Sequence, residues 1–160
     1  MDFQSRASIR RLVNRVLDGE RLNIDEVDQF QAALREKLKL AGEPLDADWT
    51  RVFDLLRAMS LLDESDPALP WNRGSLLEDL GRHTEAADAD LDAFSRMKRK
   101  LERGDQLDDG EEWAEAALYQ ACRKLIIGGQ PLSAAILSRR LKDREYSQDI
   151  QDMLKTQIAE

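Results

Sequence analysis

The segment from Trp71 to Phe94, WNRGSLLEDLGRHTEAADADLDAF, constrains the fold more than any other part of the chain. It predicts a short helix, a break at Leu80-Gly81 and a second helix, because glycine readily adopts the backbone conformations that end helices. Gly74 and Ala86 are small residues placed where two packed helices would have to approach each other closely. The segment therefore predicts a helical hairpin.

Apolar residues at helical spacing predict further helices on both sides of this hairpin. No run alternates between apolar and polar residues as a half-buried strand would. We therefore expect an all-α protein of about eight helices, in which short connections make consecutive helices antiparallel. The apolar stripes are Ile9, Leu12, Val13, Val16 and Leu17; Ile24, Val27, Phe30, Leu34 and Leu38; Trp49, Val52, Phe53, Leu56 and Met59; Trp113, Ala117, Ala121 and Leu125; and Ile150, Met153 and Leu154.

The ends of the helices are predicted from capping residues, glycines and prolines. Gly128-Gly129 should end one helix, and Pro131 suits the first turn of the next, where its missing donor would be unpaired anyway. The segment DESDPALP, residues 63–70, reads as a turn between packed helices because proline disfavours helix at the residue before it. The predicted caps are Asn23 with Glu26, Asp46 or Asp48, Thr84, Asp108 with Glu111, and Ser147.

The length of 160 residues suits one domain with a substantial core. We expect a single all-helical domain over residues 1–160. Within it, residues 1–62 form N-terminal helices, 70–145 form hairpins and 146–160 form a C-terminal capping helix. The first helix has a narrow apolar stripe, which would either cap the core or mediate formation of a homo-oligomer.

Charge and composition narrow the expected partners and compartment. A net charge of −8 argues against direct binding to nucleic acid. A single cysteine excludes an intrachain disulfide and favours a reducing compartment. The chain lacks an apolar run of the length that a bilayer crossing needs, and its N-terminus lacks the pattern of a signal peptide. We therefore expect a cytoplasmic protein without a membrane partner.

The residues that usually carry catalysis or bind metals are scarce. His83 is the only histidine, and Cys122 lies on a largely apolar helical stripe, which predicts a buried inert thiol. Asp88, Asp90 and Asp92 have the first spacings of a calcium loop but lack its glycine and final glutamate, so we interpret them as solvated helix surface. The sequence therefore predicts no catalytic residue, no metal site, no cofactor and no enzymatic activity.

The order of residues in the hairpin resembles the tetratricopeptide repeat, with an aromatic start, a small residue, a glycine turn and then alanines. The matching words are Asn72-Arg73-Gly74, Leu80-Gly81-Arg82 and Glu85-Ala86. A second, degraded unit is predicted from about Trp113. Because the family's closing proline is missing and residues 102–110 interrupt the period, the alternatives are a short irregular solenoid of this type and a helical bundle.

This resemblance implies a protein-binding module, such as an adaptor, chaperone or assembly factor, that docks a peptide or helix of another protein. The alternative function is an acidic regulator that occupies a basic site on a nucleic-acid-binding protein. Basic clusters such as Lys98, Arg99, Lys100 and Arg103 read as ordinary charged helix surface. The candidate partner-binding residues are Asn72, Arg73, Glu78 and Asp79 on one unit, and Glu115, Tyr119 and Arg123 on the other.

Overall fold

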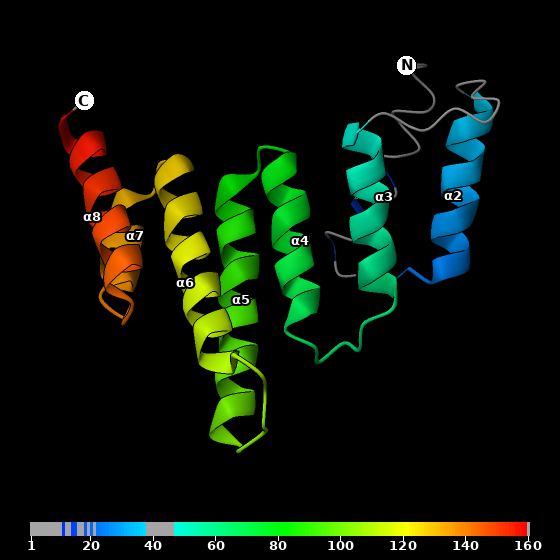
Figure 1. The fold of residues 1–160 in the computed structure, drawn as a ribbon. Coiled ribbons are helices and arrows are strands. Elements are labelled where there is room, and N and C mark those ends of the chain that lie inside the picture. Colours follow the sequence, from blue (N-terminus) through cyan, green and yellow to red (C-terminus); the bar gives the residue numbers. More distant parts are fainter. Residues whose placement is uncertain are drawn as a thin grey trace. The chain divides into compact units, whose positions relative to one another are not determined.

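The computed structural model describes residues 11, 14, 15, 18, 20, 22–37 and 47–159, and within these residues the regular structure is entirely helical (Figure 1). This confirms the all-α prediction. The first predicted helix lies largely outside the described residues, although Arg11, Asn14 and Arg15 are helical. The labelled helices are α2 (Ile24–Lys37), α3 (Ala47–Ser60), α4 (Ala68–Asp79), α5 (His83–Glu102), α6 (Gly110–Ile127), α7 (Pro131–Ser138) and α8 (Arg144–Ala159).

The chain divides into two compact units, Met1–Asp63 and Glu64–Glu160. The boundary falls within the predicted proline-containing turn. Whether the two units constitute one domain stays a prediction.

The first unit contains the α2–α3 pair. The predicted cap at Asn23 is confirmed, because its Oδ1 accepts the Glu26 backbone N–H at 2.8 Å and its amide donates to the Glu26 carboxylate at 3.2 Å. Asp46 lies outside the described residues, while Asp48 lies inside α3 and is not its cap. The buried residues of this unit come from the predicted stripes and the segment before α2: Leu22, Val27, Leu34, Phe53, Leu56 and Met59.

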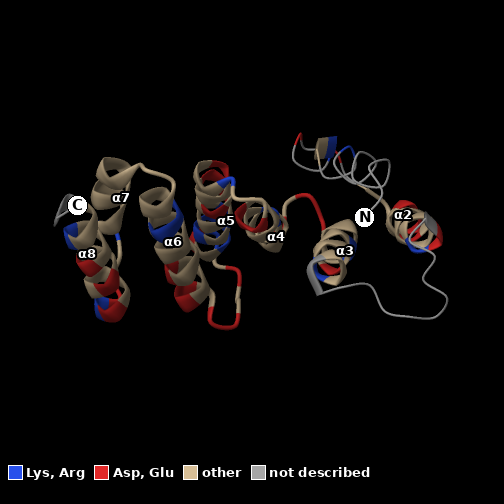
Figure 2. Ribbon diagram, turned by 90° about the horizontal axis from the view of Figure 1, so that it is seen from above, with Lys and Arg blue, Asp and Glu red and all other residues tan. Residues whose placement is uncertain are grey.

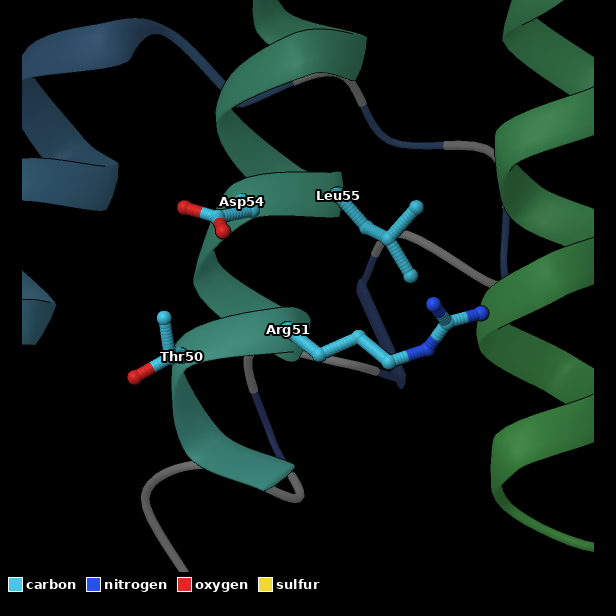
Figure 3. A pocket seen from close by; sticks show the side chains of 4 residues that line it. All are labelled: Thr50, Arg51, Asp54 and Leu55. Atoms are coloured by element: carbon cyan, nitrogen blue, oxygen red, sulfur yellow. The ribbon is translucent and has the colours of Figure 1, made fainter. Parts of the chain in front are cut away.

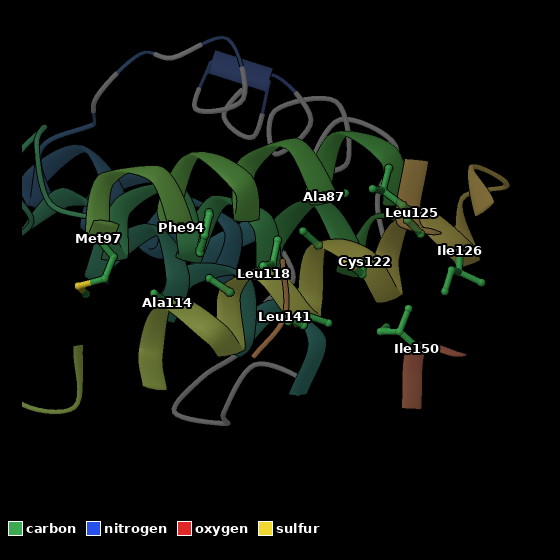
Figure 4. Close-up of a cluster of buried hydrophobic side chains, with 13 residues drawn as sticks. Ala87, Phe94, Met97, Ala114, Leu118, Cys122, Leu125, Ile126, Leu141 and Ile150 are labelled. Carbon is green, nitrogen blue, oxygen red and sulfur yellow. The ribbon is translucent and has the colours of Figure 1, made fainter. Parts of the chain in front are cut away.

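The core of the second unit is formed between α5, α6, α7 and α8 (Figure 4). Five of its thirteen residues are alanines, which let neighbouring helices pack closely. Trp71 and Trp113 are only partly buried and pack against the edge of this core. The core residues are Ala87, Phe94, Met97, Ala114, Ala117, Leu118, Ala121, Cys122, Leu125, Ile126, Ala134, Leu141 and Ile150.

The α4–α5 and α6–α7 hairpins turn in the same way. Gly81 and Gly129 both have positive φ, at 75° and 81°. After Gly81, the Arg82 N–H donates to the Leu77 carbonyl at 2.9 Å, and the Gly81 N–H donates to Glu78 at 2.9 Å. The equivalent bonds after α6, to the carbonyls of Leu125 and Ile126, are 2.8 and 3.1 Å. Both turns are therefore Schellman motifs, in which glycine is favoured because other residues strain at positive φ.

The positions of buried residues also recur between the two hairpins, always 48 residues apart in the sequence. Each buried residue of a set in α4 and α5 has a buried counterpart at that spacing in or just after α6 and α7. The second hairpin is shorter, since α7 has 8 residues and α5 has 20. The pairs are Leu69 and Ala117, Pro70 and Leu118, Gly74 and Cys122, Leu76 and Lys124, Leu77 and Leu125, Ala86 and Ala134, Asp90 and Ser138, and Ala93 and Leu141.

The predicted boundary before α4 was wrong by three residues. Helix α4 begins at Ala68, so Pro70 lies in its first turn, where a missing N–H leaves no helical hydrogen bond unmade. The Asp66 carboxylate accepts the Ala68 N–H at 2.9 Å and takes part in starting the helix.

Three predicted helix caps were also wrong. Thr84 lies inside α5, because the preceding N-cap position is taken by Arg82, whose guanidinium pairs with Glu85 at 2.5 Å. Asp109, with a left-handed φ of 54°, takes the position predicted for Asp108 at the start of α6. Ser147 lies inside α8, since the Asp143 carboxylate accepts the Tyr146 N–H at 3.1 Å one turn earlier. At the starts of α5 and α6 the N-cap residue makes no side-chain capping bond, so the spacing of acceptor side chains did not locate these starts.

Gly74 lies at a close contact between α4 and α5, where no side chain larger than hydrogen fits. A Cβ added at Gly74 would lie 2.3 Å from Asp90 Oδ1 and 3.2 Å from the Ala86 carbonyl oxygen. The predicted role of Gly74 and Ala86 in close packing is confirmed. Because the neighbouring backbone of α5 cannot move away cheaply, a methyl group here would force the two helices apart.

We predict that Gly74→Ala lowers the free energy of unfolding by about 2 kcal/mol, because overpacking outweighs alanine's better helix propensity. Urea denaturation monitored by circular dichroism measures the change. Ser75→Ala, one residue along the same helix, is the matched control and should change stability by less than about 0.5 kcal/mol. Equal stability of Gly74→Ala and Ser75→Ala would contradict a close contact between α4 and α5 at Gly74.

Candidate protein-binding face

The structure places the predicted partner-binding residues on two helices of the second unit. Asn72, Arg73, Glu78 and Asp79 lie on α4, whereas Glu115, Tyr119 and Arg123 lie on α6. Only Asp79 is exposed, and the other six are half-buried. Most of them contact other parts of the same chain, and these contacts link α4, α6 and α8.

Helices α4 and α6 are joined by long side chains. The Arg123 guanidinium donates to the Glu78 carboxylate at 2.5 Å and to Gln120 at 2.8 Å. Nearer the start of each helix, the Trp71 and Trp113 rings lie 5.4 Å apart at an interplanar angle of 49°. Such tilted aromatic pairs attract each other beyond the burial of their surfaces.

Helices α6 and α8 are joined by a second set of contacts. The Tyr119 hydroxyl donates to the Asp149 carboxylate, and its ring stacks on Tyr146 with centroids 4.4 Å apart. Glu115 accepts the backbone N–H groups of Lys142 and of Asp143, the latter at 3.0 Å. We call the surface made by these two sets of contacts the α4–α6–α8 face. It comprises Trp71, Glu78, Trp113, Glu115, Tyr119, Arg123 and Tyr146.

Beneath this face lies a buried ion pair that sequence reasoning missed. Lys124 Nζ is 2.7 Å from Asp90 Oδ2 and 3.5 Å from the Glu78 carboxylate, and Asp90 is 0% exposed. The prediction that Asp90 is solvated surface was wrong. Gly74 lets the α4 backbone cover the carboxylate, and the Lys124 ammonium makes the burial of its charge tolerable. Lys124 also lies 6.0 Å from the centroid of the Trp71 ring.

The sequence contained a usable signal for this pair. Asp90 continues the stripe of Ala86, Ala93 and Met97 at helical spacing, so it lies on the buried side of α5. Lys124 lies similarly beside Ala121 in α6. A charged residue within an apolar stripe requires a partner of opposite sign. The first hairpin supplies the carboxylate of Asp90, and the second supplies the ammonium of Lys124.

The surroundings shift the acid–base properties of these groups in opposite directions. Burial raises the pKa of the Asp90 carboxyl to about 6, while the Lys124 ammonium acts against this shift. For Glu78, burial alone would raise the pKa, but the hydrogen bond from Arg123 and the charge of Lys124 together hold it below its usual value. Burial, together with the bond to Asp149, raises the pKa of Tyr119 to about 12. The more exposed carboxylate, Glu78, is thus held charged, whereas the buried carboxylate of Asp90 takes up a proton more readily.

The other residues considered for chemistry are placed by the structure as follows. Cys122 is completely buried, and burial raises the pKa of its thiol to about 11, which confirms the prediction of an inert buried thiol. His83 is half-buried at the start of α5, with Nδ1 buried and unbonded. Within the described ranges, no group of three or more His, Cys, Asp or Glu side chains is arranged to hold a metal ion.

A separate pocket lies along α3 in the first unit, with a volume of about 460 Å³ (Figure 3). Its lining side chains are Thr50, Arg51, Asp54 and Leu55, which extend from successive turns of one helix. This lining includes none of the predicted partner-binding residues. One open helical surface does not supply converging groups of the kind that small-molecule sites use.

The comparisons with known proteins add no family to this description. No protein-family model, curated protein or solved structure matches the chain. None of the helices in the described part of the chain combines the length and apolar character needed to span a bilayer.

We predict that Asp90 makes the stability of the second unit depend on pH. Its pKa is about 6 in the folded chain against 3.8 in the reference state, so folding takes up a proton between these values. The contribution of this group to stability therefore increases as the pH falls through about 6 and is lost as the pH rises. Between about pH 7.5 and pH 4.5, the wild type should gain about 2 kcal/mol relative to Asp90→Asn in urea denaturation. A difference between the two proteins that does not change with pH would contradict the shift.

Proposed function

We propose that the chain is a non-enzymatic protein–protein interaction module whose α4–α6–α8 face docks a peptide or a helix of another protein. The observation that carries the proposal is that half-buried aromatic and charged side chains make contacts that join α4 to α6 and α6 to α8. Aromatic and arginine side chains are enriched at the centres of protein interfaces. Their mutual contacts fix their positions before a partner arrives, which reduces the entropy lost on binding.

The repeated glycine turns of the two hairpins support a stack of helical hairpins as part of this proposal, with 48 residues between Gly81 and Gly129 where the tetratricopeptide repeat has about 34. The glycine turns and the buried counterparts recur at one spacing, as expected if two copies of a hairpin unit stack. Stacked hairpins of this type place the first helix of each pair on one surface and the second on the other. In Figure 2, α7 lies to one side of α6 and α8. A face made by first helices could bind one extended or helical segment along several units.

The distribution of charges favours a partner that is recognised by shape and specific contacts over one that is attracted by a surface of a single charge sign. Figure 2 shows acidic residues toward the start of α6 and basic residues toward its end, both signs on α8, and acidic residues in the loop between α5 and α6. On the face itself, Glu78 and Arg123 neutralise each other. An acidic regulator would instead use the loop that contains Asp105, Asp108 and Asp109, and its binding would weaken strongly with salt.

Affinity capture from an extract of the source cells, followed by mass spectrometry, tests the proposal. Ser75→Arg places a long cation between Trp71 and Glu78 on α4, whereas Asp88→Arg places the same side chain on an exposed position of α5. A partner that docks on the face should bind at least about tenfold more weakly to Ser75→Arg and unchanged to Asp88→Arg. Circular dichroism checks that both variants are folded.

The same capture at low and at moderate salt separates the two functions. A partner retained at both concentrations and lost only with Ser75→Arg supports docking on the face. Capture that disappears at moderate salt and is insensitive to Ser75→Arg would sink the proposal and favour the acidic regulator. Equal retention by both variants at both salts would place binding elsewhere on the chain.

A further inference from the structure

A basic pocket lies outside the α4–α6–α8 face, on the C-terminal half of α5. It has a volume of about 360 Å³ and is lined by the segment at residues 64–65 and by one side of α5. Four of its lining residues are cationic and two are acidic, in a chain whose net charge is −8. The lining residues are Glu64, Ser65, Asp92, Arg96, Arg99, Lys100 and Arg103.

One of these cations builds the wall of the pocket. Arg96 pairs with Asp92, both of its bonds to that carboxylate measuring 3.1 Å, and Arg96 Nη1 donates to the Glu64 carbonyl at 2.5 Å. Arg96 therefore fixes the segment before α4 against α5. Because Asp92 is neutralised by this pair, its carboxylate contributes little net negative charge to the pocket.

Two other cations of the pocket, Arg99 and Lys100, have no carboxylate partner among the described residues. Arg99 makes one long bond, to the Ser95 carbonyl at 3.4 Å, and Lys100 has no ion pair within the described ranges. Arg103 is balanced by Asp105 at 3.1 Å. On α4, Arg73 lies within reach of the charges of both Asp92 and Arg96, and its Nε is buried without a hydrogen-bond partner. Among the lining residues, subtracting the Glu64 charge from those of Arg99 and Lys100 leaves an uncompensated charge of about +1.

We propose that this pocket binds a phosphate monoester. A monoester carries a charge between −1.5 and −2 near pH 7, which the four cations of the lining attract. Its three terminal oxygens accept hydrogen bonds from several directions, as required by cations at successive positions of α5. A planar carboxylate would instead pair with one guanidinium at a time. Binding at this pocket is independent of the proposed docking face.

Titration with inorganic phosphate, followed by amide NMR shifts at constant ionic strength, tests the site in the full chain. Saturable shifts should appear at residues 64–66 and 96–103. The variant Arg99→Gln/Lys100→Gln should raise the dissociation constant about tenfold or more, since two charge-assisted contacts are lost. The charge-matched control, Arg139→Gln/Lys142→Gln, removes two exposed cations from the segment after α7 and should leave the constant unchanged. If the double variant is not folded, Arg99→Gln alone, at an exposed side chain, replaces it.

Two further probes distinguish the source of the phosphate group. Tighter binding of a phosphoserine peptide than of glucose 6-phosphate would assign the site to a phosphorylated protein, whereas the reverse would assign it to a phosphorylated small molecule. Either result supports the pocket if the Arg99→Gln/Lys100→Gln variant loses it. Shifts that do not saturate, or that weaken equally in the control variant, would overturn the proposal because they indicate only general charge screening.

Discussion

The buried ion pair between Asp90 and Lys124 is the interaction on which the second unit depends. It links α5 to α6, and Gly74 of α4 covers it, so three helices meet at one pair of charges. A carboxylate and an ammonium that are both at most 3% exposed would each be strongly destabilising alone. Glu78 extends this pair to the surface, where it meets Arg123. The α4–α6–α8 face is therefore positioned from below by the same charges that hold the helices together.

The fold was largely predictable from local patterns, because glycine turns and apolar stripes act over a few residues. Gly81 and Gly129 ended helices as predicted, and the stripe of Phe53, Leu56 and Met59 was buried as predicted. Helix starts were less predictable, because at Thr84 and Ser147 competing residues one turn or less away took the cap positions. The Asp90–Lys124 pair is a contact between hairpins, and no pattern within one helix states which distant residue will supply the partner charge.

The candidate site combines what could be read from the sequence with what could not. The sequence indicated that Glu78, Tyr119 and Arg123 lie on the first helices of two hairpins. It did not indicate that Arg123 bonds to Glu78 or that Tyr119 bonds to Asp149. These bonds change the interpretation of the residues. They are held in place by the chain itself, so a partner would meet a preformed surface rather than free side chains. The basic pocket on α5 is likewise formed by residues of one helix together with a segment from before α4, which sequence spacing could not bring together.

The most direct measurement of the central interaction is a double-mutant cycle with Asp90→Leu and Lys124→Met, followed by urea denaturation at neutral pH. Lys124→Met leaves the Asp90 carboxylate buried without its partner and should lose about 3 kcal/mol of unfolding free energy, whereas Asp90→Leu also removes the cost of burying that carboxylate and should lose less. The double variant removes both charges, so it should be at least about 2 kcal/mol more stable than the sum of the single losses predicts. Strictly additive losses would contradict a paired buried charge as the centre of the unit.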